Sequence, residues 1–85
     1  MALKDDEYRA VVQKVVLLGK HGPYVVTKCE KLGSVTFALE WEVWQEKDLP
    51  SQGTFVVLTD LRKKPAGWRA GSARYYRPSD VGSTS

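Results

Sequence analysis

Residues 53–78, GTFVVLTDLRKKPAGWRAGSARYYRP, decide the fold. Thr54–Leu61 is a dense apolar run whose side chains would be apolar on both faces of an extended chain, which is typical of a central strand. Pro and Gly within Arg62–Gly67 predict a turn, because Pro cannot donate to a strand ladder and Gly tolerates a left-handed backbone. Trp68–Arg77 predicts a second strand, with a bulge or close backbone contact at Gly71 and the serine after it. The stretch therefore predicts a β-hairpin.

Three further β segments precede this hairpin. Tyr8–Leu18 fits helical spacing as well as a strand, but its four valines favour a strand because β-branched side chains pack well on a pleated sheet. Gly and Pro in Gly19–Pro23 predict a turn into a second β segment, Tyr24–Lys31. Ser34–Leu39 has the clearest period of two in the chain and predicts a half-buried strand.

The segment after that strand allows two interpretations. The alternation of Val35, Phe37 and Leu39 can be continued to Trp41, which would then lie in the core. Alternatively the chain bends after Glu40, and residues 41–48 form one or two helical turns. We expect a strand to about Glu40, a loop or short helical turn after it, and a Pro- and Gly-containing loop at 48–53.

Together these segments predict one all-β domain at residues 8–78. Five short strands need an arrangement without exposed sheet edges, and a small five-stranded antiparallel barrel, closed or partly open, is the economical solution. We expect residues 1–7, which are polar and acidic, and residues 79–85 to be disordered.

The layout of Leu49–Pro78 resembles the closing strands of cold-shock-like oligonucleotide-binding (OB) barrels. The resemblance rests on a Gly-led apolar strand, a polar turn, and a second Gly-led strand that contains a small residue and ends in Arg-Pro; the matching positions are Gly53, Val56, Val57, Gly67, Ala70, Arg77 and Pro78. It implies an OB-like barrel. The aromatic RNA-contacting motifs of that family have no counterpart in Tyr24–Leu39, so no ligand-contacting residue is implied.

Positive charge is concentrated on the predicted hairpin. The chain has 13 Lys and Arg against 10 Asp and Glu, and six of the basic residues lie between Arg62 and Arg77 with no acid among them. Seven basic and ten acidic residues remain elsewhere, a balance of −3. This distribution favours an anionic partner more than an evenly spread +3 would.

The hairpin also supplies aromatic rings beside its cations. Single-strand binders combine cations that follow the phosphates with rings on which bases stack. We therefore predict a nucleic-acid partner, RNA in preference to DNA, and a binding site composed of Arg62, Lys63, Lys64, Trp68, Arg69, Arg74, Tyr75, Tyr76 and Arg77. Because adjacent side chains of a strand face opposite ways, at most one of the two tyrosines should be buried.

An alternative site is the tryptophan pair Trp41 and Trp44. Acidic residues surround both rings, so if exposed they would suit a protein partner or a second copy of the chain better than a nucleic acid. The competing interpretation places Trp41 in the core as an extension of the preceding strand.

No other group of residues in the sequence indicates a metal site or a catalytic site. His21 has no second histidine or paired cysteine to complete a metal site, and Cys29 is expected to be a small core residue. No acid/base pair or phosphate loop can be named, so we expect a binding protein without enzymatic activity or cofactor. A single cysteine, no signal-like start and no long apolar run favour a cytoplasmic protein outside membranes.

Overall fold

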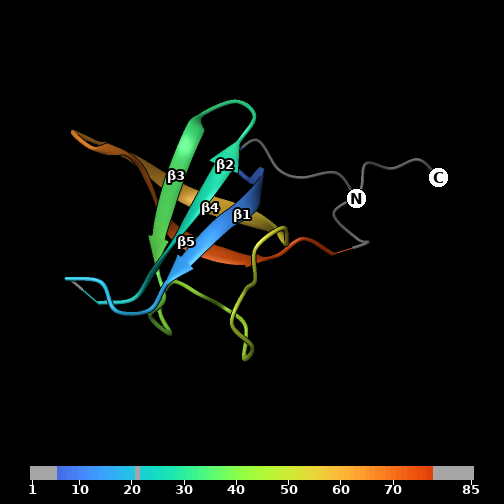
Figure 1. Cartoon of the computed structure of the whole chain (residues 1–85). Coiled ribbons are helices and arrows are strands. Elements are labelled where there is room, and N and C mark those ends of the chain that lie inside the picture. Colours follow the sequence, from blue (N-terminus) through green and yellow to red (C-terminus); the bar gives the residue numbers. More distant parts are fainter. Residues whose placement is uncertain (1–5, 21, 78–85) are drawn as a thin grey trace.

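The computed structural model describes residues 6–20 and 22–77 of the chain (Figure 1). Its elements are β1 (Tyr8–Val16), β2 (Tyr24–Cys29), β3 (Gly33–Ala38), β4 (Phe55–Lys64) and β5 (Gly67–Tyr75). These residues contain no helix, so the all-β prediction and its five strands are confirmed. Five of the ten predicted strand ends lie one or two residues too far out, whereas Thr54–Leu61 stops three residues short of the end of β4. Residues 1–5 and the whole tail 79–85, as well as His21 and Pro78, lie outside the described residues.

The five strands close into an OB-like barrel in the order β1-β2-β3-β5-β4, with β4 paired back to β1. Four of the pairings are antiparallel, as predicted. The fifth is parallel: β3 and β5 join through only two residue pairs, Val35 with Trp68 and Thr36 with Arg69. The connection at 39–54 begins and ends at the same end of the barrel, so β4 runs back along it, and the β4–β5 hairpin then reverses the chain again and leaves β5 parallel to β3 (Figure 1).

Side chains from every strand fill the barrel. The buried core comprises Ala10, Val12, Val25, Cys29, Val35, Phe37, Trp44, Val56, Leu58, Ala70 and Ala73. Cys29 is buried, as predicted. Thr27 is the buried polar residue among those described, and its hydroxyl donates a hydrogen bond to the carbonyl of Val35 at 2.8 Å. This hydrogen bond replaces the one to water that the hydroxyl loses on burial.

The segment between β3 and β4 buries one of its two tryptophans and exposes the other. The backbone N–H groups of Val43 and Trp44 both donate to the carbonyl of Glu40, so the chain turns there, without forming a helix. Trp44 is then buried at 6% exposure, whereas Trp41 is 85% exposed. The interpretation that extended the β3 alternation to Trp41 is therefore wrong, because the turn at Glu40 ends the period of two.

This segment also covers the barrel beyond the short parallel pairing. Trp44 forms a parallel bridge with Ala73 on β5. The N–H of Ala73 donates to the carbonyl of Val43 at 2.8 Å, and the N–H of Gln45 donates to the carbonyl of Ala73 at 2.9 Å. Residues 43–45 thus supply backbone partners to the part of β5 that β3 does not reach.

The predicted irregularity at Gly71 is present as a close approach of a side chain. Asp60 on β4 has φ 55°, and its carboxylate lies where a Cβ on Gly71 would stand. Asp is one of the few residues that adopt this left-handed backbone readily. On both strands the inward side changes here: Leu58 and Leu61 pack on the core on β4, as do Ala70 and Ala73 on β5.

Candidate nucleic-acid interface

The nine predicted site residues fall into two groups at opposite ends of the β4–β5 hairpin. Near the turn, Arg62, Lys63, Lys64 and Arg69 are exposed and Trp68 is half-buried. At the other end, Arg74, Tyr75 and Tyr76 are half-buried and Arg77 is exposed. The hairpin therefore does not present one continuous surface of cations and rings.

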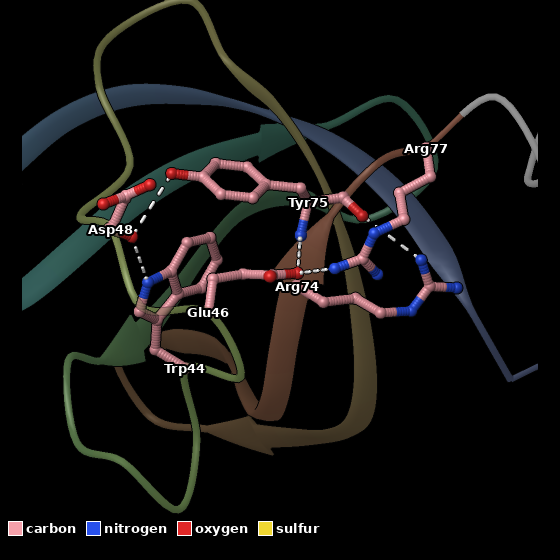
Figure 2. Close-up of polar contacts among 6 residues, drawn as sticks. All are labelled: Trp44, Glu46, Asp48, Arg74, Tyr75 and Arg77. Atoms are coloured by element: carbon pink, nitrogen blue, oxygen red, sulfur yellow. Dashed lines mark hydrogen bonds and ion pairs between the residues drawn. The ribbon is translucent and has the colours of Figure 1, made fainter.

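Tyr75 belongs to the packing of the barrel. Its ring meets that of Trp44 edge-on with centroids 5.0 Å apart, and Trp44 in turn stacks on Phe37 at 5.6 Å. Figure 2 shows the tyrosine hydroxyl and the indole N–H directed at the carbonyl of Asp48, at 3.2 and 2.7 Å. Burial raises the pKa of Tyr75, and the carboxylates of Asp48 and Glu46 raise it further, so the hydroxyl stays a proton donor at neutral pH.

Carboxylates that are distant in sequence meet two of the predicted arginines. Glu46 accepts the backbone N–H of Tyr75 at 3.1 Å and the guanidinium of Arg77 at 2.5 Å (Figure 2). Glu7 lies 3.3 Å from the guanidinium of Arg74, and only 16% of its side chain is exposed. The acid-free character of this stretch in sequence is therefore not preserved in space, and the charges of Arg74 and Arg77 are largely offset.

Near the turn the cations have less compensation. Arg62 and Arg69 are direct cross-strand partners, so their side chains leave the same side of the sheet. Like charges placed opposite each other in this way are destabilising without an anion. The ion pair of Arg62 with Asp60 spans 3.5 Å between side chains that are 68% and 58% exposed, so it offsets little of this. Lys64 lines the same hollow as the two arginines, and Asp60 and Glu40 line it too, so three cations face two carboxylates there.

The same surface continues across the parallel pairing onto β3 and β2. Arg69 pairs with Thr36, and a second hollow is lined by Lys20, Tyr24, Thr36 and Arg69. Since Val25, Thr27 and Cys29 point inward, Tyr24 lies on the outer side of β2. We name this surface the Arg69 face; its members are Lys20, Tyr24, Thr36, Arg62, Lys64 and Arg69.

Sequence reasoning missed Lys20, Tyr24 and Thr36. The alternation of β2 could have indicated an outward Tyr24, but only the pairing of β3 with β5 shows that it lies beside Arg69. Trp68, in contrast, packs against the core and pairs with Lys63, whose ammonium lies 5.9 Å from the ring centroid. This ring and cation lie on the other side of the hairpin from Arg62 and Arg69.

The remaining candidates are simpler. Burial removes Trp44 from any surface, while Trp41 stays available to a partner. Within residues 6–20 and 22–77, no three His, Cys, Asp or Glu side chains gather as metal ligands would. No helix in that part of the chain could cross a membrane. The chain matches no family model, no curated protein and no solved structure.

Proposed function

We propose that this protein binds single-stranded or structured nucleic acid, RNA in preference to DNA, through the Arg69 face, and that it acts as a binding protein and not as an enzyme. The observation that carries the proposal is the placement of Arg62 directly opposite Arg69, with Lys64 in the same hollow and Lys20 in the adjoining one. Phosphates that enter this face relieve the repulsion between the two arginines and release condensed counterions.

Tyr24 provides the second element of such a site. A ring on the outer side of β2 and cations that can follow the backbone are the two groups that single-strand binding needs. RNA is favoured because its unpaired loops present splayed bases to stacking rings. The Lys63–Trp68 pair lies outside this face, so the proposal assigns it no direct contact.

A charge-removal experiment tests the proposal. Arg62→Gln, Lys64→Gln and Arg69→Gln combined form the Arg69-face variant, and Lys14→Gln, Lys31→Gln and Lys47→Gln combined form its control. All six side chains belong to exposed residues, and both variants lose three positive charges. Fluorescence anisotropy of a labelled oligouridine, measured across a salt series, gives the affinity and its salt dependence.

The Arg69-face variant should bind more weakly, with a salt slope smaller by about 2, since each single-strand phosphate contact contributes about 0.7 to the slope. The control should retain the slope of the wild type. Equal losses in both variants would mean that net charge and not this face governs binding. No binding by the wild type at low salt would end the proposal.

A second candidate function is a protein interaction through Trp41. An 85% exposed indole flanked by Glu40 and Glu42 favours it, because large exposed rings are enriched at protein interfaces while the glutamates repel nucleic acid. A dimer in size-exclusion chromatography that Trp41→Ala converts to a monomer would support self-association. A monomeric wild type would leave only a different protein as the partner.

A further inference from the structure

A second surface with exposed rings and cations lies over β1, β4 and the end of β5. Lys28 pairs with Val11, Val11 pairs with Phe55, and the backbone N–H of Tyr76 donates to the carbonyl of Phe55 at 3.0 Å. These residues form a row across four neighbouring strands. Strands lie about 4.8 Å apart, so the row extends from a cation to two successive rings over roughly 15 Å.

Arg9 completes this surface. Its guanidinium carbon lies 5.5 Å from the ring centroid of Phe55 and 5.4 Å from that of Tyr76. The two rings are 6.5 Å apart and tilted by 60°. Phe55 is 52% exposed and Arg9 is exposed as well. We name Arg9, Lys28, Phe55 and Tyr76 the Phe55 face.

The Phe55 face is also hollowed. A groove runs over β1 and is lined by Arg9, Ala10, Val11, Lys28, Glu30 and Phe55. Its lining includes the apolar residues Ala10 and Val11 on β1; its two cations lie on β1 and β2, and Glu30 is its acidic member. The neighbouring Val57 is buried although it lies outside the main core, flanked by Arg9 and Arg74 as its cross-strand partners.

This face and the Arg69 face lie on opposite sides of the barrel. In the closed order β1-β2-β3-β5-β4, the Arg69 face centres on the pairing of β3 with β5, and the Phe55 face centres on the pairing of β1 with β4. One short strand of nucleic acid in the first hollow does not also reach the second groove. Each face can therefore hold its own strand.

We infer that the Phe55 face is a second single-strand-binding surface, on which bases stack against Phe55 and Tyr76 while Arg9 and Lys28 contact phosphates, so that one protein bridges two strands. Arginine and aromatic rings occur at both protein and nucleic-acid interfaces, so the argument for a nucleic acid rests on two features: two cations lie beside two rings, as in single-strand binders, and one of the cations is Lys28, a residue type that is depleted at protein interfaces. The bridging part of this inference rests on the proposed function of the Arg69 face, but strand binding at the Phe55 face does not.

The test uses the full chain and two oligouridines of roughly 4 nucleotides, the short end of the range of about 4–16 nucleotides that one small barrel covers, so that one strand occupies one face. Uridine strands do not pair with each other, so energy transfer between a donor-labelled and an acceptor-labelled strand reports bridging by protein. The Phe55-face variant combines Arg9→Gln with Phe55→Ala, both at exposed positions, and Arg9→Gln alone serves if the pair lowers stability. Lys47→Gln combined with Leu49→Ala is the matched control, because it also removes one exposed cation and one exposed apolar side chain, and neither residue belongs to the Arg69 face or the Phe55 face. Sedimentation without oligonucleotide measures the oligomeric state of the wild type and of each variant, because a dimer could also bridge two strands by binding one on each copy.

We expect the wild type and the control with Lys47→Gln and Leu49→Ala to bind two strands and to give energy transfer. The Arg69-face variant and the Phe55-face variant should each bind one strand and give no energy transfer. In the Arg69-face background, adding the Phe55-face changes should weaken the remaining binding by at least roughly 5- to 150-fold, the value of one lost stacking contact.

The two proposals can fail separately. If the Phe55-face variant bridges strands as the wild type does, or if the Arg69-face variant binds no strand at all, the second surface does not exist and the proposed function stands. If the Arg69-face variant binds as tightly as the wild type while the Phe55-face variant does not bind, the proposed function is wrong and the second surface remains. If Arg9→Gln and Phe55→Ala leave strand binding intact but abolish binding of a protein partner, the Phe55 face is a protein interface.

Discussion

The two tryptophans between β3 and β4 should differ sharply in their effect on stability, although three positions separate them. Trp44 is 6% exposed, stacks on Phe37, meets Tyr75 edge-on and donates its indole N–H to Asp48. An aromatic side chain buries about 150–250 Å², which at about 25 cal/mol per Å² corresponds to roughly 4–6 kcal/mol. Measured truncations of buried Phe or Trp to Ala cost about 3–5 kcal/mol. Trp44→Ala should therefore lower the free energy of unfolding by about 3–5 kcal/mol.

This loss is a large fraction of the total stability, because a domain of 85 residues has a free energy of unfolding of roughly 4–13 kcal/mol. Urea denaturation followed by circular dichroism should show the midpoint falling by about 3–5 M, given a slope near 1 kcal/mol per M for a domain of this size. Trp41→Ala, at 85% exposure, should stay within about 0.5 kcal/mol of the wild type. A loss below about 1 kcal/mol for Trp44→Ala, or above about 2 for Trp41→Ala, would refute the packing described here.

Two further stability predictions concern β5. Gly71→Ala should cost about 1–3 kcal/mol because its Cβ meets the Asp60 carboxylate, and most of that cost should vanish in an Asp60→Gly background; an undiminished cost there would contradict the steric explanation. Glu46→Ala should cost about 1–3 kcal/mol because it leaves the half-buried N–H of Tyr75 without its acceptor. Arg77→Ala removes an exposed cation that pairs with Glu46, so it should cost at most about 1 kcal/mol. Thermal denaturation of both variants compares the two losses, and a larger loss for Arg77→Ala than for Glu46→Ala would contradict this explanation.

Local signals sufficed for the strands and the barrel, because apolar alternation, Gly and Pro turns and β-branched runs act over a few residues. The same signals left the position of Trp41 open between the core and a turn after Glu40. The turn itself is made by local bonds to the carbonyl of Glu40, but residues 43–45 also bond to Ala73 on β5, and no local pattern predicts a partner about thirty positions away.

The candidate site shows the same limit. Counting charges along the hairpin located Arg62, Lys64 and Arg69, but it could not show that Glu7 and Glu46 fold back onto Arg74 and Arg77. Tyr24 escaped notice because its nearness to Arg69 comes from the parallel pairing of β3 with β5, which joins two parts of the chain about thirty residues apart.

That parallel pairing is one of the two seams along which two parts of the chain meet. Strands β1 to β3 form one meander of local antiparallel contacts, β4 and β5 form one hairpin, and the barrel exists only when the two dock along β1–β4 and β3–β5. The Arg69 face takes Tyr24 from the meander and Arg69 from the hairpin, across the pairing with the fewest residue partners. A ligand that contacts both Tyr24 and Arg69 binds only the docked form, so by mass action it stabilises the closed barrel against separation of the meander and the hairpin.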